Sequence, residues 1–452
     1  MAVDAALVER LDGQLAQDLE PTNGRLGKVR RYLKGEHDDP YMPKGAKEEY
    51  RHLAKRAITN WTPLLSDTYS KGLFVDGYRP ARSGDNMTAW NYWQENKLDA
   101  RQSIVHRGAL DYGTSYNLIL PGTVQTRRVP LMKPLSPLRA TAWYRDVDDD
   151  FPEIGLRRVG TTIDGARLVE VFDKTSRYTY ALPKDSGKWV LSKVEDHGQG
   201  VTPFVRFRDR LDDESVGIIR PIINLQDRVN EVVFATLIAL QYASFRQRWA
   251  TGLVVPEDDD GNPVSPFEAA VDRLWVSDSD GAKFGDFAQT ELSGHMSAYE
   301  STVRTLAAVS QVSPNILTGD LVNLSADALA QMEASTQRKI SEYETLFGES
   351  WEMSFHLAAQ AAGDPSAADA GAQVRWRDTE ARSLASTVDA LGKIAQMLQV
   401  PVEALWEKIP GVTDTDVTRW KELRDSGDVL GALVGDFQRQ TAAIEAPATS
   451  EE

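Results

Sequence analysis

Two acidic clusters are the residues of this chain whose types could bind a cation. They are DVDDD at 146–150 and EDDDGN at 257–262. A twelve-residue calcium loop needs glycine at its sixth position and a carboxylate at its twelfth. Counting from Asp146 puts Phe151 at the sixth position, and placing Gly261 there puts Phe267 at the twelfth. Neither cluster fits, so both are predicted to be solvated turns.

The histidines do not form a metal-binding pattern either. They are His37, His52, His106, His197, His295 and His356. The sequence contains no HExxH motif, no histidine pair at i,i+4 and no cysteine that could complete a site. His37 beside Glu36, Asp38 and Asp39 could bind a metal only adventitiously. We therefore predict no metal site and no cofactor.

Nucleotide and nucleophile motifs are also missing from the sequence. It contains neither a GxxxxGK[ST] phosphate loop nor a GxSxG nucleophile elbow. YGTSYN at 112–117 is better explained as a turn between a helix and a strand. The eleven tryptophans fall mostly on apolar faces, which indicates core packing or subunit contact rather than base stacking. We predict no catalytic residue and no enzymatic activity.

Composition predicts a globular chain of two to four domain-sized units. It has 452 residues, of which 41% are hydrophobic, and no cysteine, so disulfides and thiolate chemistry are excluded and a reducing, intracellular assembly site fits. The N-terminus is expected to be an amphipathic helix over 1–20 rather than a signal peptide. The most apolar window, 232–240, is far shorter than the ~20 residues that a membrane span needs. We expect no membrane segment.

The elements that must position these residues follow from hydrophobic periodicity, and the pattern is α+β and mainly helical. Helices are predicted over 1–20, 24–35, 46–73, 87–96 and 100–111. From 115 to 207 the period changes to two, which predicts a meander-like β region. Short strands are predicted at 74–80 and 373–378, and 381–437 is predicted to be helical with a turn at IPGVTDTD. The Ala-rich acidic tail, 438–452, is expected to be disordered.

The stretch from Gly217 to about Ala330 is the most informative. A helix opens at Pro221 and is predicted to run to Trp249, before Gly252. An insert at 251–292 precedes a second helix over about 295–310. A polar loop then leads to a long helix that begins near Ser325 and keeps a continuous apolar face to about Ala362. This order suits a mechanical part better than an enzyme.

Several segments together resemble the portal proteins of tailed bacteriophages. They are LQDRVNE (225–231), RWATG (248–252), VSPNILTGD (312–320), LSADAL (324–329), VRWRDTEARSLASTVDALGKI (374–394) and VPVEALWEKIPG (400–411). No single string is diagnostic, but their order and spacing together are fairly specific. The resemblance covers nearly the whole chain.

This resemblance implies a portal fold with wing, stem, clip and crown regions. The implied regions are wing 1–215, stem helix 216–249, clip 250–293, stem helix 294–311, tunnel loop 312–325, wing with a long kinked helix 326–381, and crown 382–437. The implied channel residues are Gly319, Asp320, Leu321, Val322 and Asn323. The implied docking residues of the clip are Asp258, Asp259, Asp260, Asp278 and Asp280.

The function implied is a homo-oligomeric, dodecameric ring at one capsid vertex, assembled in the host bacterial cytoplasm and threaded by double-stranded DNA without sequence specificity. The implied partners are the terminase large subunit, a head-completion or adaptor protein, and the major capsid and scaffolding proteins. The formal charge of −16 is consistent with a conduit that repels phosphate, although charge alone fits any soluble acidic protein better.

Two features depart from the family pattern. The candidate tunnel loop has no lysine or arginine, which puts a direct grip on phosphate in doubt, and it could instead be an ordinary connection buried against the wing. The clip is rich in acid, so it either contacts a basic partner or only stays soluble. The alternatives are another minor head or scaffold protein, and a monomeric α+β hydrolase built around Asp146, Asp148 and Asp150.

Overall fold

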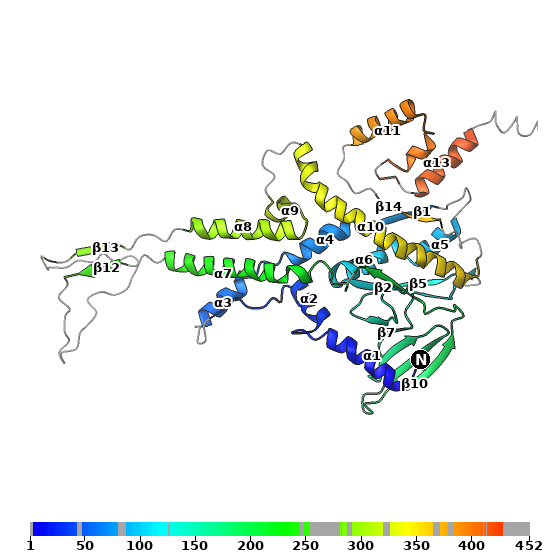
Figure 1. Cartoon of the computed structure of the whole chain (residues 1–452), viewed down its shortest axis with the longest axis horizontal. Helices are drawn as coiled ribbons and strands as arrows, with labels where there is room; N and C mark the ends of the chain where they lie inside the picture. The colour runs from blue at the N-terminus through cyan, green and yellow to red at the C-terminus, as the bar shows by residue number, and fades with distance from the viewer. Residues whose placement is uncertain are drawn as a thin grey trace, which may run out of the picture. The chain divides into compact units, whose positions relative to one another are not determined.

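The computed structural model places most of the chain in well-defined elements (Figure 1). The described residues are 3–42, 48–79, 87–124, 127–212, 214–244, 248–252, 281, 283–286, 292–319, 326–364, 371–377, 384–409, 411–412 and 414–427. They divide into two compact units. Unit 1 comprises 1–17, 67–217 and 337–452, and unit 2 comprises 18–66 and 218–336. The predicted α+β, mainly helical class is confirmed.

Unit 1 contains the β region that period-two alternation predicts. A five-stranded antiparallel sheet has the order β10-β9-β8-β7-β6, in which every strand pairs with its sequence neighbour. Its strands are β6 (Ala140–Trp143), β7 (Ile154–Thr161), β8 (Arg167–Phe172), β9 (Ser176–Leu182) and β10 (Val190–Asp196). The predicted meander is confirmed for this sheet.

The ends of the β region form a separate sheet of order β11-β2-β5. It consists of β2 (Thr114–Leu120), β5 (Leu131–Leu135) and β11 (Phe204–Arg208), and a short pair, β3 (Thr123–Val124) with β4 (Arg127–Arg128), follows β2. Phe172 and Phe204 bring the two larger sheets together, with ring centroids 5.4 Å apart. Gly113 precedes β2 at φ +88°, where a Cβ would lie 2.5 Å from the Ser215 carbonyl carbon.

The core of unit 1 is built around α10 (Ala326–Ala362), whose predicted bounds are confirmed. Phe347, Trp351 and Phe355 of this helix are fully buried. Trp351 packs edge-on against Trp93, at 4.8 Å between centroids, and donates from Nε1 to His106 Nε2 at 2.9 Å. Trp93 lies on α5 (Met87–Glu95), and His106 lies on the next helix, α6 (Leu98–Tyr112). Aromatic packing therefore fixes these three helices together.

The remaining elements of unit 1 confirm the short predicted strands. β1 (Val75–Arg79) pairs antiparallel with β14 (Gln373–Trp376), with Tyr78 opposite Val374. The C-terminal helices are α11 (Leu384–Leu398), α12 (Glu403–Trp406) and α13 (Asp414–Gly427). The N-terminal helix α1 (Ala5–Asp18) buries Val8, Leu11 and Leu15. The predicted tail at 438–452 lies outside the described residues.

Unit 2 is helical, with one pair of short strands. Its helices are α2 (Arg25–Leu33), α3 (Glu48–Ala57), the first turn of α4 (Thr62–Gly72), the 3₁₀ turn η1 (Arg220–Ile222), α7 (Ile223–Ser244), α8 (Ser293–Val309) and α9 (Pro314–Thr318). Its strands are β12 (Arg248–Thr251) and β13 (Lys283–Asp286). Within the described part of the chain, no helix is both long and apolar enough to cross a bilayer.

One predicted helix of this region is wrong. The segment 46–73 is two helices, α3 and α4, separated by 58–61. Asn60 lies before the second helix, and its Oδ1 accepts from the Thr62 backbone N–H at 3.2 Å. Pro63, in the first turn, has no backbone N–H that would need an acceptor. The apolar stripe continues across the break, which is why periodicity alone predicts one helix.

Candidate functional site: the paired helices and their polar seat

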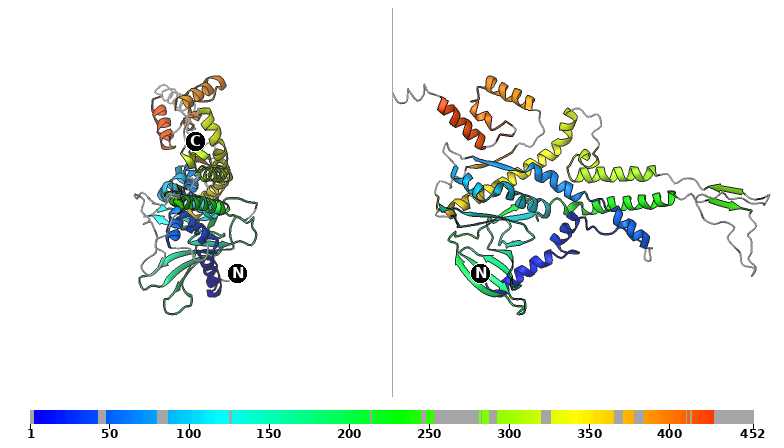
Figure 2. Two further views of the ribbon diagram at one scale, coloured as in Figure 1. Left: turned by 90° about the vertical axis from the view of Figure 1, so that its left-hand side faces the viewer. Right: turned by 180° about the vertical axis from the view of Figure 1, so that it is seen from behind.

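The two helices α7 and α8 lie side by side, and the strands β12 and β13 lie beyond their far ends (Figures 1 and 2). Ile222 of η1 and Gln226, Val229 and Asn230 of α7 are buried and share one helical face. Further along, Phe234 packs with Ala54 and Ala57 of α3. The sequence therefore folds α7 with one buried face at its base.

Both helices of the pair carry large apolar side chains that are exposed. Leu240 of α7 is 41% exposed, and Met296 and Val309 of α8 are each 52% exposed. One side of α8 also carries a shallow groove of about 550 Å³. It is lined by Ser297, Glu300, Ser301, Arg304, Thr305, Ala308 and Val309. This face of α8 thus combines small side chains with an exposed ion pair between Glu300 and Arg304.

The predicted end of the first long helix is wrong. The helix is expected to reach Trp249, but α7 ends at Ser244 and 248–251 is a strand. Trp249 lies opposite Gly285 and Thr251 opposite Lys283 in the antiparallel pair. The partner strand is more than thirty residues away in the sequence, so helical periodicity could not reveal it. Gly252, at φ +74°, follows the strand.

The end of α8 is closed by a left-handed residue. Gln311 has φ +56°, its N–H donates to Ala308 O at 3.2 Å, and the Val312 N–H donates to Ala307 O at 3.0 Å. This pair of bonds is the Schellman arrangement. The Thr336 hydroxyl donates to Gln311 O at 3.0 Å, which ties the start of α10 to this turn. The chain direction after α8 is therefore fixed.

The loop predicted at 312–325 is not irregular throughout, because Pro314–Thr318 forms the five-residue helix α9. Pro314 occupies its first turn, and Gly319 ends it at φ +72°, donating to Asn315 O at 2.8 Å. Gly319 therefore has the left-handed conformation that glycine adopts readily at the end of a helix. The other channel candidates, Asp320, Leu321, Val322 and Asn323, lie outside the described residues, as do all the clip docking candidates, Asp258, Asp259, Asp260, Asp278 and Asp280.

The base of α7 is held by a polar seat, which we define as Gln226 and Asn230 with the residues they contact. Gln226 is 0% exposed; its Oε1 accepts from the Trp61 N–H at 3.1 Å and its Nε2 donates to Thr59 O at 2.6 Å. Asn230 Oδ1 accepts from the Thr59 N–H at 3.1 Å. These two side chains supply the partners that the backbone between α3 and α4 lacks.

His37 completes the polar seat in its neutral form. Its Nδ1 accepts from Asn230 Nδ2 at 2.9 Å, so its Nε2 carries the hydrogen and donates to Tyr32 O at 3.1 Å and Asn60 Oδ1 at 3.2 Å. Burial lowers the pKa of His37, against smaller raising effects of Tyr32 and Asn60. Because both ring nitrogens are engaged, the adventitious metal site considered at His37 is not available.

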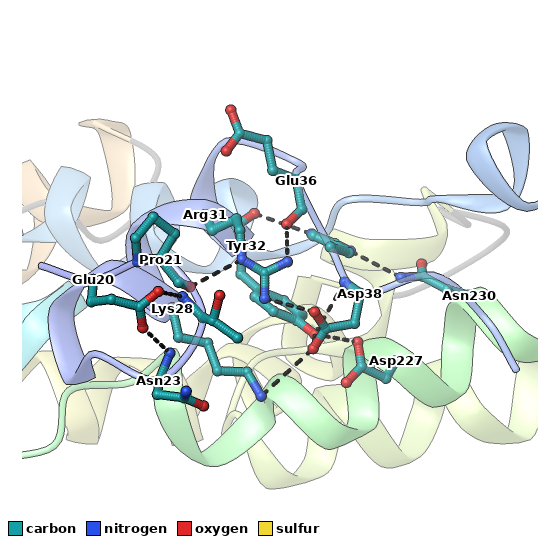
Figure 3. A network of polar contacts seen from close by, with 12 residues as sticks. Glu20, Pro21, Asn23, Lys28, Arg31, Tyr32, Glu36, Asp38, Asp227 and Asn230 are labelled. Atoms are coloured by element: carbon teal, nitrogen blue, oxygen red, sulfur yellow. Dashed lines mark hydrogen bonds and ion pairs between the residues drawn. The ribbon is translucent and has the colours of Figure 1, made fainter.

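A charged cluster borders the polar seat (Figure 3). Asp38 Oδ1 lies 2.6 Å from an Arg31 nitrogen, and its Oδ2 lies 3.7 Å from Lys28 Nζ. The Tyr32 hydroxyl lies between Asp38 Oδ2, at 3.0 Å, and Asp227 Oδ1 on α7, at 2.7 Å. This cluster connects α2 and the turn after it to the second turn of α7.

The acidic turn at 146–150 has the predicted character of a surface turn. Asp146 and Asp148 use their backbone amides to hydrogen-bond Asp149 Oδ2, at 3.0 Å, and Asp146 Oδ1, at 3.2 Å. Arg206 also donates to Val147 O at 2.7 Å. Among the described residues, no group of three or more acidic or histidine side chains is placed to hold a metal ion. The carboxylates here organise their own turn.

Sequence reasoning missed the polar seat, although a signal for it was present. Gln226 and Asn230 are four residues apart and share a helical face with Ile222 and Val229. Polar side chains on an otherwise apolar face must find buried partners. Which partners they find could not be read from the sequence, because Thr59 and Trp61 lie more than 160 residues away.

The paired helices α7 and α8, a capped turn, the short helix α9 and the long helix α10 are the elements that surround this site. A family model described as "Phage portal protein, SPP1 Gp6-like" matches residues 14–428. The chain therefore belongs to this family of phage portal proteins, which are structural proteins of the virion.

Comparison with solved structures gives distant matches in gene transfer agent (GTA) particles. A chain titled as the virion of the native GTA particle has a TM-score of 0.44 and 11% identity, covering 83% of this chain and 99% of its own. A chain from the neck of the empty GTA particle, computed with C6 symmetry, has a TM-score of 0.45 and 11% identity, covering 77% and 90%. Comparison with curated proteins finds no match.

Proposed function

We propose that this portal protein forms a closed, dodecameric ring at one capsid vertex, through which double-stranded DNA passes during packaging and ejection. In this proposal α7 and α8 are the stem, 250–293 the clip, 312–325 the tunnel loop and 382–437 the crown. The observation that supports the ring most directly is the exposed face of α8. A surface of that kind on a single chain fits a neighbouring copy of the chain.

The small side chains of this face support close approach of a second helix. Ser297, Ser301 and Thr305 follow one another at four-residue steps and line the groove with Ala308. The exposed methyl groups of Val309 lie at its end. In a ring the same face meets a different face of the next copy, and a constant rotation closes the contact.

A bulky residue in the groove tests this contact. We expect Ser301→Trp to lower the ring fraction at micromolar concentration, measured by size-exclusion chromatography with light scattering. Ser103→Trp is the matched control, since Ser103 is an exposed serine on α6. Rings that survive Ser301→Trp as well as the control would exclude the groove as a subunit contact.

We propose that the clip docks the terminase large subunit during packaging and a head-completion or adaptor protein afterwards. Its acidic residues favour a basic partner surface. Replacing 256–290 with a short Gly/Ser linker should leave a soluble ring that binds neither protein. Binding of both by the shortened chain would move the docking surface elsewhere.

The major capsid and scaffolding proteins are the further partners of this proposal, and the virion vertex, reached by assembly in the host bacterial cytoplasm, is the proposed location. The conduit itself requires no chemistry from the chain, so we propose no enzymatic role. Asp146, Asp148 and Asp150, on which the alternative hydrolase hypothesis is built, lie exposed on a surface turn.

A further inference from the structure

The contact between Tyr32, Asp38 and Asp227 requires more hydrogens than one tyrosine supplies. The Tyr32 hydroxyl oxygen lies within hydrogen-bond distance of both carboxylates, at 3.0 and 2.7 Å, and the tyrosine is 0% exposed. A hydroxyl donates one hydrogen, and an ionised carboxylate only accepts. With both carboxylates ionised, one of the two short contacts would join oxygen atoms with no hydrogen between them.

The charges around Asp38 and Asp227 indicate which of the two carboxylates is the more readily protonated. Arg31 and Lys28 both lie against Asp38, whose side chain is 52% exposed. In the described part of the chain, no lysine or arginine forms an ion pair with Asp227. The titratable groups that act on the charge of Asp227 are Lys28, Asp38 and His37, from α2 and the turn after it. The neighbouring side chains on α7, Arg228 and Glu231, are exposed.

We propose that Asp227 carries a proton and donates it to Tyr32 Oη, while the Tyr32 hydroxyl donates to ionised Asp38. Every short contact in the chain Asp227, Tyr32, Asp38 then contains one hydrogen. Loss of the proton from Asp227 would leave two anionic groups around one hydroxyl and weaken the attachment of α7 to α2. The device is a proton-dependent latch at the base of α7, and it does not depend on the portal assignment.

The electrostatic environment agrees with this arrangement. Burial raises the pKa of Asp227, and the negative charge of Asp38 raises it further, against lowering effects of Tyr32 and Lys28. For Asp38, burial is outweighed by Arg31, Tyr32 and Lys28, so its pKa lies below the ordinary value. Burial and Asp227 raise the pKa of Tyr32, which keeps its hydrogen. A raised carboxyl pKa means that the stability it contributes is lost as pH rises through it.

Amide hydrogen exchange measured by mass spectrometry from pH 4.5 to 9 tests the latch, with intrinsic rates corrected for pH. Asp227→Asn keeps a donor toward Tyr32 but cannot ionise. We expect the protection of peptides from 24–40 and 223–234, expressed as the ratio of wild type to Asp227→Asn, to fall at least threefold as pH rises. Using the ratio removes only the part of the His37 titration that does not depend on the charge of Asp227.

Asp18→Asn is the matched control, because Asp18 lies next to α2 in a half-buried pair with Arg25 at 4.0 Å. Its ratio to wild type should be independent of pH. A flat ratio for Asp227→Asn would show that Asp227 does not change its charge in this range and would overturn the proposal. If Asp227→Asn does not fold, the profile of His37→Gln, which lacks the imidazole, decides: protection of 24–40 and 223–234 that does not decline as pH rises contradicts the latch.

Discussion

Replacing Gln226 with methionine tests whether the polar seat holds the base of α7. Methionine has a similar length and keeps the apolar packing, but it removes the bonds to Trp61 N–H, Thr59 O and Asn230 Oδ1. The Asn230 amide oxygen keeps its bond from the Thr59 N–H. The Trp61 donor and the Thr59 acceptor lose their partners.

The size of the effect follows from those two backbone groups. A buried polar group without a partner costs about 1–3 kcal/mol. Because Thr59 and Trp61 are only part-buried, water can reach them in part, and we expect a total of about 2–3 kcal/mol. At about 1.4 kcal/mol per tenfold, protection against hydrogen exchange should fall roughly 30- to 150-fold in 48–66 and 223–234.

The matched control is Gln241→Met, the same substitution at an exposed position of the same helix. We expect it to change protection by less than about threefold, because exposed polar side chains contribute little. The comparison is made by hydrogen exchange mass spectrometry at one neutral pH. Equal protection in the two variants would refute the structural role assigned to Gln226.

Three further predictions test other parts of the account. His37 has a lowered pKa, so the stability that it contributes is complete above about pH 6.5 and declines as pH falls below that value. Amide hydrogen exchange in 30–40 should therefore accelerate from pH 7 to 5 in wild type, and less in His37→Gln. Arg157 and Glu170 are paired at 2.5 Å across β7 and β8, with side chains 10% and 12% exposed; Glu170→Gln should cost about 3–5 kcal/mol in urea unfolding because it leaves a buried cation. The control is Glu195→Gln, on the exposed edge strand β10, which should change the urea midpoint of unfolding little. Equal urea midpoints for Glu170→Gln and Glu195→Gln would contradict a special role of the buried pair. Replacing Leu321 and Val322 with lysine should preserve ring assembly but slow DNA packaging, most at low salt, whereas wild-type rates at every salt concentration would place this loop away from the DNA.

Much of the fold could be predicted because it follows from local periodicity. Apolar residues recur at helical spacing in the sequence over about 325–362, so a long helix could be predicted there, and α10 spans Ala326–Ala362. The five strands from β6 to β10 are each paired with the next, and turn residues separate them. Local signals also identify Gly319, since a left-handed residue that ends a short helix favours glycine.

The parts that could not be predicted depend on distant partners. The break at 58–61 is stable because Gln226 and Asn230 form hydrogen bonds with its backbone, and the residues near the break do not predict these distant partners. Strand β12 exists because β13 pairs with it, although RWAT follows the helix without a proline or glycine. The polar seat itself joins α2, the connection between α3 and α4, and α7. Its residues become a site only when the chain is folded.

Native mass spectrometry of the purified wild-type chain, at micromolar concentration and several salt levels, tests the central claim most directly. We expect a single closed assembly with a mass that is an integral multiple of 50.2 kDa, and the proposed dodecamer when the chain is isolated from assembled particles. Monomer alone under all these conditions, with no ring in assembled particles, would contradict the proposed portal ring.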